Sequence, residues 1–160
     1  MIDYKKQGKK NRASGRVFEM NVRKEMESKG WIVCKWVNNV EFYDLGEKGK
    51  CWAAWEGDDK FNILAHIIPA KHKFNPFNRA MVMGTGFPDF ICFRINDSVM
   101  LNHKSTYDVI GVEVKSNGTL NKEEKSKCKW YLDHKIFSKI LIAKKGNKRG
   151  KIEYKEFEHE

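Results

Sequence analysis

The feature that most constrains the fold of this chain is a pair of charged motifs set into apolar runs. Asp89 stands in a run from Phe87 to Phe93, and Glu113-Val114-Lys115 closes a run that begins at Val109. Runs rich in Val, Ile and Phe predict buried strands, and a buried carboxylate without a partner is costly. Two carboxylates and a lysine at the ends of such strands therefore need a partner, and a divalent metal ion would satisfy them.

Alternation along the second strand divides its residues between two faces. Glu113 shares one face with Gly111 and Lys115, because side chains two residues apart point the same way. The other face is apolar and carries Ile110, Val112 and Val114. This strand is therefore predicted to bury one face and to carry candidate site residues, Glu113 and Lys115, on the other.

The first strand is predicted to begin just after Pro88, which suits the start of a strand. It runs from Phe90 to Ile95, with a turn near Asn96-Asp97. If the two strands are neighbours, Asp89 and Glu113 converge on one point. Their oxygens suit Mg²⁺ or Mn²⁺, and a nearby lysine can stabilise charge on a phosphate or orient a water.

The pattern Pro88-Asp89, a strand-pair spacer and then Glu113-x-Lys115 resembles the metal-dependent PD-(D/E)xK nuclease superfamily. The resemblance covers residues 14–40 and 84–143. It implies an α/β, restriction-endonuclease-like mixed β-sheet flanked by helices, with a core that runs helix, three strands, helix, strand. Among the branches, the chain looks most like the archaeal and viral Holliday-junction resolvases and the virus-type replication-repair nuclease domains.

The resemblance also implies an activity and a site. The chain would be a Mg²⁺-dependent endonuclease, with Mn²⁺ able to substitute, that cuts DNA, in particular branched DNA, as a homodimer. Asp89, Glu113 and the backbone carbonyl of Val114 would hold the metal, and Lys115 would assist the water and the transition state. The family often adds a metal-ligating glutamate on the first helix.

This chain offers such a helix. Ser14 predicts an N-cap, residues 15–29 a helix, and Gly30 its end. Glu19 lies beside Met26 at the edge of an apolar helical stripe. It is either a further metal ligand and catalytic residue, which the other motifs favour, or an edge glutamate whose head reaches water. The stripe consists of Phe18, Val22 and Met26.

The elements after Lys115 follow the same order. Residues 120–134 correspond to the second helix, residues 137–143 to a buried strand, and residues 152–157 to an edge strand, with a basic turn at 144–151. Many relatives place a glutamine or similar residue of this helix at the site. Here the region supplies Glu123, Glu124 and Lys125, so this element departs from the pattern.

The net charge of +10 is concentrated in two regions. Residues 1–12 carry five basic residues and one acidic residue, and residues 115–151 carry twelve and three, whereas residues 13–114 carry thirteen of each. Such a distribution is typical of a surface that binds a phosphate backbone, although a solvated lysine-rich face is the alternative. The candidate nucleic-acid-binding residues are Lys9, Lys10, Arg12, Arg16, Lys71, Lys73, Arg79, Lys122 and Lys125.

Residues 41–83 form an insert of uncertain structure between the first and second core strands, too long for an ordinary loop. Residues 51–55 and 61–68 could be strands, and Trp52 and Trp55 are expected to pack on the core. Residues 71–79 interleave basic and aromatic side chains. These could stack on unpaired bases or pack on the protein, and the sequence does not separate the two.

Length predicts a single domain over residues 1–160, with residues 1–13 as a basic flexible arm. The chain is expected to be cytoplasmic, with reduced cysteines; a zinc site of Cys51 with His66 or His72 fits the spacing poorly. Two rival functions remain open. The chain could be a non-catalytic nucleic-acid-binding module that keeps the fold, or a DNA or RNA nuclease indifferent to branching.

Overall fold

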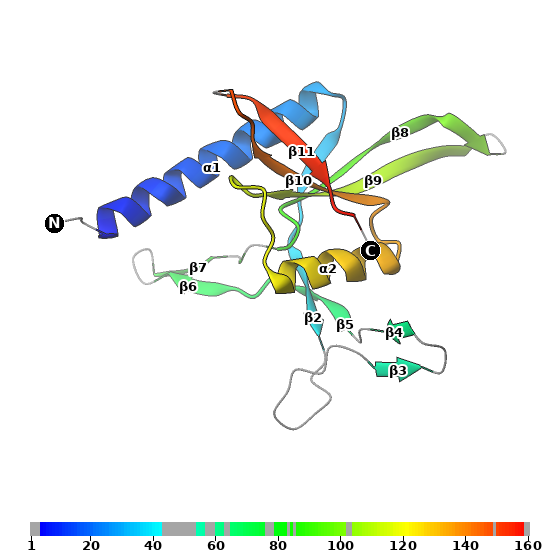
Figure 1. Cartoon of the computed structure of the whole chain (residues 1–160), viewed down its shortest axis with the longest axis horizontal. Coiled ribbons are helices and arrows are strands. Elements are labelled where there is room, and N and C mark those ends of the chain that lie inside the picture. The colour runs from blue at the N-terminus through cyan, green and yellow to red at the C-terminus, as the bar shows by residue number, and fades with distance from the viewer. Residues whose placement is uncertain are drawn as a thin grey trace.

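The structure is a computed structural model that describes residues 4–42, 54–56, 60–62, 65–75, 79–82, 84, 86–101, 104–148 and 150–158. A five-stranded mixed sheet forms its centre, with two helices, α1 (Tyr4–Ser28) and α2 (Lys122–Asp133) (Figure 1). In order across the sheet the strands are β1 (Ile32–Lys35), β8 (Phe90–Leu101), β9 (Lys104–Val114), β10 (Lys139–Lys145) and β11 (Ile152–Glu156). The predicted α/β class is confirmed.

The directions of the paired strands determine which strand ends lie next to one another in the sheet. Strands β8 and β9 are antiparallel neighbours, whereas β9 and β10 are parallel. The start of β8 therefore lies beside the end of β9, and the end of β10 lies at the same edge of the sheet. This edge receives both charged motifs, as the sequence predicts.

Apolar packing on the two faces of the sheet holds the helices in place. The predicted stripe of α1 is buried against β1, β8 and β9, where Val22 and Ile110 are fully buried. Helix α2 packs on the other face, where Tyr131 and Ile140 are fully buried. The alternation predicted for β9 is confirmed, because Ile110 and Val112 pack with α1, whereas Val109, which points to the same face as Glu113, packs with α2.

The first helix begins earlier than predicted. It starts at Tyr4 and not at Ser14, so residues 4–13 are helical and their prediction as an arm is wrong for this segment; residues 1–3 lie outside the described part. The reason is propensity, since Lys, Gln, Arg and Ala favour helices and no proline interrupts them. The predicted end is confirmed at Gly30, whose φ of 81° suits a glycine after a helix.

The hairpin of β8 and β9 is longer than predicted. A turn near Asn96-Asp97 was expected, but β8 continues to Leu101, and the pairing is irregular between Asn96 and Leu101. Across the pair, the Asn96 amide donates to Asp108 at 2.9 Å. Because this polar residue has a cross-strand partner, it does not end the strand as its turn propensity alone would suggest.

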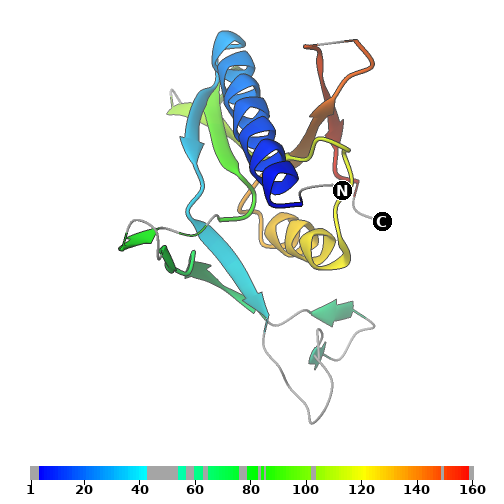
Figure 2. The same cartoon turned by 90° about the vertical axis from the view of Figure 1, so that its left-hand side faces the viewer.

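The insert, together with the three residues before it, forms two-stranded sheets apart from the central sheet (Figure 2). Its strands are β2 (Asn38–Phe42) with β5 (Ala65–Pro69), β3 (Ala54–Glu56) with β4 (Lys60–Asn62), and β6 (Lys73–Asn75) with β7 (Ala80–Val82). The strand expected at 51–55 is seen only at its end, because residues 51–53, with Cys51 and Trp52, lie outside the described residues, as does the side chain of Trp55. The strand expected over residues 61–68 is divided between β4 and β5.

The described cysteines, Cys34, Cys92 and Cys128, carry free thiols. In the part of the chain that the structure describes, neither helix combines the length and hydropathy that crossing a membrane requires.

Candidate active site

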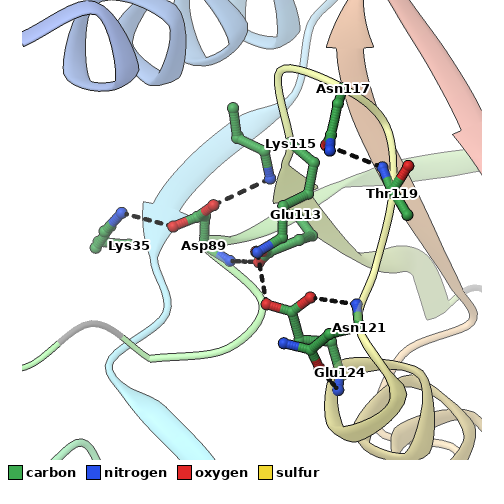
Figure 3. Close-up of polar contacts among 9 residues, drawn as sticks. Lys35, Asp89, Glu113, Lys115, Asn117, Thr119, Asn121 and Glu124 are labelled. Carbon is green, nitrogen blue, oxygen red and sulfur yellow. Dashed lines mark hydrogen bonds and ion pairs between the residues drawn. The ribbon is translucent and has the colours of Figure 1, made fainter. Parts of the chain in front are cut away.

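Asp89 and Glu113 are joined by a reciprocal pair of backbone hydrogen bonds (Figure 3). The backbone N–H of Asp89 donates to Glu113 Oε2 at 3.0 Å, and the backbone N–H of Val114 donates to Asp89 Oδ2 at 3.0 Å. Each carboxylate is therefore fixed by the strand that carries the other. The structure thus brings together the two acids that the sequence placed at adjacent strand ends.

The chain before Asp89 is clamped against the segment that follows β1. Phe87 N–H donates to the carbonyl of Asn38 at 2.9 Å, and Trp36 N–H donates to the carbonyl of Asp89 at 3.1 Å. A side chain at Gly86 would lie 2.2 Å from the Trp36 carbonyl oxygen. Only glycine fits there, so the Gly86-Phe87-Pro88-Asp89 motif can lie directly on its neighbour.

A buried tyrosine of α2, Tyr131, is hydrogen-bonded to the same segment before Asp89. The Tyr131 hydroxyl donates to the Phe87 carbonyl at 2.8 Å and accepts from Trp36 Nε1 at 3.2 Å. Its side chain is fully buried, and burial raises the pKa of Tyr131 to about 12. This hydroxyl therefore links α2, the loop before Asp89 and the segment after β1.

Removing this hydroxyl should destabilise the protein. Tyr131→Phe leaves the buried Phe87 carbonyl and the Trp36 indole N–H without their partner, and we expect a loss of about 1–3 kcal/mol in the free energy of unfolding. Urea unfolding of the variant measures it. Tyr107→Phe is the matched control, because Tyr107 is 55% exposed and its change should have little effect. Equal stabilities of the two variants would contradict the anchoring role.

Lys35 connects Asp89 to the glutamate of the first helix. Its ammonium lies 3.3 Å from Asp89 Oδ1 and forms a close ion pair with Glu19. Lys35 follows Val33 by two residues, so it shares the side of β1 that packs toward α1, and its ammonium lies 4.9 Å from the centre of the Phe90 ring. Glu19 therefore joins the site through a lysine and not by direct contact with Asp89.

Lys115 forms the equivalent link on the other side of the site (Figure 3). Its ammonium lies 3.2 Å from Glu113 Oε1 and 2.5 Å from Glu124 Oε1. Glu124 is held by a capping box at the start of α2, where its second oxygen accepts from Asn121 N–H and its own N–H donates to Asn121 Oδ1. The helix cap thus fixes the position of the Lys115 ammonium.

Burial and crowding control the charges of the two acids. Burial, with a further contribution from Asp89, raises the pKa of Glu113 to about 8, and burial also raises the pKa of Asp89 above its ordinary value. Burial opposes the charges of Lys35 and Lys115. Hydrogen bonds to Glu19 and Glu124 and the nearby acids outweigh it, so that both lysine pKa values are raised. The site holds carboxylates that favour a cation or a proton, beside lysines that stay charged.

These side chains open into one cavity of about 410 Å³ between α1, the strand ends and α2. Glu19, Asp89, Glu113, Val114 and Lys115 all line it. The structure therefore gathers the complete set of candidate catalytic and metal-binding residues around one solvent-accessible space.

The donor set fits a divalent ion. Asp89 and Glu113 each commit one oxygen to a backbone N–H and present the other to a lysine ammonium, so a divalent ion would bind the second oxygen of each in place of that ammonium. Among the described residues, no three His, Cys, Asp or Glu side chains are yet grouped as a metal site. Lys35 lies between Glu19 and Asp89, and Lys115 lies between Glu113 and Glu124.

The candidate nucleic-acid-binding residues fall in separate regions. Lys9, Lys10, Arg12 and Arg16 are exposed on α1, and Arg12 and Arg16 lie on the side of Glu19 by their spacing. Lys122 and Lys125 are exposed at the start of α2, beside the cavity-lining Asn121 and Glu124. In the insert, Lys71 pairs with Glu41 at 3.0 Å, Arg79 is exposed, and the side chain of Lys73 lies outside the described part.

Phe74 bears on the alternative left open for the insert. It is 61% exposed, so packing on the core does not explain this aromatic residue, and a stacking role remains compatible with its position.

Sequence reasoning missed two residues of the site. Lys35 is signalled only by a lysine two positions after an apolar strand residue, which is a weak pattern. Glu124 carries a stronger signal, because Asn121-x-x-Glu124 has the spacing of a capping box. This second helix was expected to depart from the family pattern, yet it supplies a residue that contacts Lys115.

Comparisons with protein-family models, with curated proteins and with solved structures found no match to this chain.

Proposed function

We propose that the chain is a metal-dependent endonuclease that hydrolyses phosphodiester bonds in DNA. The observation that carries this proposal is the reciprocal pairing of Asp89 and Glu113, with Lys115 at 3.2 Å from Glu113, in a polar cavity. Acids whose pKa values are raised by burial, beside lysines that stay charged, form an arrangement suited to a divalent ion and a polyanionic substrate.

The order of elements supports a restriction-endonuclease-like fold. In chain order α1, β1, β8, β9, α2 and β10 reproduce helix, three strands, helix, strand, with the insert between the first two strands of the sheet. The acids lie where the superfamily motif would place them, at the start of the second sheet strand and the end of the third.

Each residue of the site would have a separate role. Asp89 and Glu113 would hold Mg²⁺, with the Val114 carbonyl and Glu19 completing the site. When bound, the ion would supply Lewis acidity toward the scissile phosphate and its attacking water. Lys115 would hold a positive charge beside the developing phosphorane, since Glu124 and Glu113 fix its ammonium. Lys35 would orient Glu19 and Asp89.

A cleavage panel tests the proposal and its substrate. The purified protein is incubated with Mg²⁺ or with a chelator on a four-way junction, a flap, a linear duplex and a single-stranded RNA. We expect metal-dependent cleavage, with the junction cut best and symmetrically by a homodimer. Inactivity on every substrate with both Mg²⁺ and Mn²⁺ would contradict the nuclease. Equal cutting of the linear duplex would reject the preference for branched DNA.

One observation favours a second candidate, a nucleic-acid-binding module without catalysis. Lys35 and Lys115 already balance the charges of the acids in the protein alone. Such a module would need no metal. It would bind DNA equally well with and without Mg²⁺, and it would cleave no member of the panel.

Metal binding should strengthen as the pH rises. Burial raises the pKa of Glu113 to about 8, so below this pH a metal ion must displace its proton. We expect the Mn²⁺ affinity to rise up to about tenfold per pH unit below about pH 8 and then to level off. Calorimetry in buffers of different ionisation enthalpy measures both the affinity and the proton release, which should vanish well above this pKa. An affinity that is independent of pH would contradict the prediction.

A further inference from the structure

A second cavity lies on the other flank of α1. It has a volume of about 300 Å³ and lies between this helix and the turn that joins β10 to β11. Helix α1 contributes Ser14 and Asn21, the end of β10 contributes Lys145, and the turn contributes Lys148 and Lys151. Of the described residues that line this cavity, which we call the turn cavity, none is acidic.

The turn cavity presents cationic and neutral donors together. The Lys145 ammonium lies 5.7 Å from the centre of the Phe18 ring, so this lysine reaches from the end of β10 toward α1. Glu153, an acid on the adjacent strand β11, is paired with Lys144 at 3.3 Å. Ammonium groups with hydroxyl and amide donors beside them are a chemistry that suits a phosphate group.

The lysines of this turn are held by its backbone. Lys151 N–H donates to the Lys148 carbonyl at 3.0 Å, and Gly146 N–H donates to the Lys151 carbonyl at 2.8 Å. Gly150 has a φ of 83°, a conformation that favours glycine. The closed turn keeps Lys148 and Lys151 on the same short loop beside α1.

The turn cavity lies at the same sheet edge as the candidate active site. Strands β9 and β10 are parallel, with Val114 opposite Ala143, so the end of β10, just before the turn, lies beside Lys115. Backbone hydrogen bonds join the two segments, from Lys115 N–H to the Ala143 carbonyl at 2.9 Å and from Lys145 N–H to the Ser116 carbonyl at 3.4 Å. Helix α1 separates the cavities, with Glu19 lining the active site and Phe18 lining the turn cavity.

We propose that the turn cavity binds a backbone phosphate of the nucleic acid whose scissile bond lies in the active site. The inference rests on the proposed function for the identity of the polyanion. A free phosphate would offer the same chemistry, and the test separates the two sources. The role of the cavity is to hold the strand beyond the cleavage point, so it should contribute to affinity and not to the chemical step.

The experiment compares two double variants that lose the same charge. Lys148→Gln/Lys151→Gln alters the turn cavity, and Lys135→Gln/Lys139→Gln removes two positive charges near the start of β10, at the opposite end of that strand. Binding of a fluorescein-labelled linear duplex is measured by anisotropy, with a chelator present, over a series of KCl concentrations. We expect the turn variant to bind about ten- to a hundredfold more weakly at moderate salt and to reduce the salt slope by about two, while the control changes little.

The outcomes distinguish a nucleic-acid phosphate from a free phosphate, and they distinguish failure of the turn-cavity proposal from failure of the nuclease proposal. Equal loss in both variants would show only a long-range effect of charge and would overturn the inference. Unchanged binding of the turn variant would also overturn it. So would inorganic phosphate that shifts the Ser14 and Asn21 NMR signals while duplex binding stays unchanged, because the cavity would then be a small-anion site. Selective loss of duplex binding in a protein that cleaves nothing would support phosphate binding in the turn cavity and reject the nuclease. Cleavage by a protein whose two double variants lose binding equally would support the nuclease and reject the turn cavity as a phosphate site.

Discussion

Asp89→Asn and Glu113→Gln should each abolish metal-dependent cleavage, with a loss in kcat of about a thousandfold or more. Both changes remove a carboxylate charge from the cavity and keep the shape of the side chain. Asparagine at position 89 still offers an oxygen to the Val114 N–H, and glutamine at position 113 still offers one to the Asp89 N–H. The loss should therefore reflect chemistry and not unfolding.

Two measurements separate these explanations. Thermal unfolding should show both variants folded. Burial raises the pKa of Asp89 and raises the pKa of Glu113 to about 8, so the charged form of each carboxyl group is costly to bury and an uncharged amide avoids that cost. Asp108→Asn is the matched control on the same strand as Glu113, since Asp108 contacts Asn96 and Arg94 away from the cavity. Full activity of either site variant would remove the metal site from the proposal. Inactivity of the control as well would point to a general loss of structure.

The parts of the fold that could be predicted are those with a strong local pattern. The apolar stripe of α1 and the alternation in β9 have the periods of a helix and a strand, so the buried faces followed from the sequence. The start of α1 and the length of β8 did not. Both depend on weak preferences: Ser14 is a good cap that the helix does not use, and Asn96 is a good turn residue that finds a cross-strand partner in Asp108.

The candidate site shows the same division. Asp89 and Glu113 could be predicted because charge in an apolar strand requires an explanation, and strand neighbours converge. Lys35 could not be predicted, because its role depends on the pairing of β1 with β8. These two strands are separated in sequence by more than fifty residues, which include the insert. Glu124 was within reach of its capping box, but the link from this cap to Lys115 arises only when α2 packs on the sheet. Long-range packing thus decides which polar residues meet.

Lys115 offers the second large effect. We expect Lys115→Met to lower kcat by about a hundred- to a thousandfold, because the variant removes a fixed positive charge from the side of the cavity where the phosphate must lie. Its loss also leaves Glu113 without its cation, which should raise the Glu113 pKa further and weaken metal binding at neutral pH. The loss should therefore be smaller at higher pH, where Glu113 ionises again.

The cap residue provides the comparison that tests this account. Glu124→Gln can keep the two hydrogen bonds of the capping box, because the amide oxygen still accepts from the Asn121 N–H and the backbone N–H still donates to Asn121 Oδ1. The change removes the negative charge that lies 2.5 Å from the Lys115 ammonium. Because it only positions Lys115, its loss in kcat should be several times smaller than that of Lys115→Met, and the double variant should lose no more than Lys115→Met alone. Steady-state rates for the two single variants and the double variant give this coupling directly. Additive losses would mean that Glu124 acts independently, so that the contact between helix cap and lysine would not be what places the charge at the phosphate.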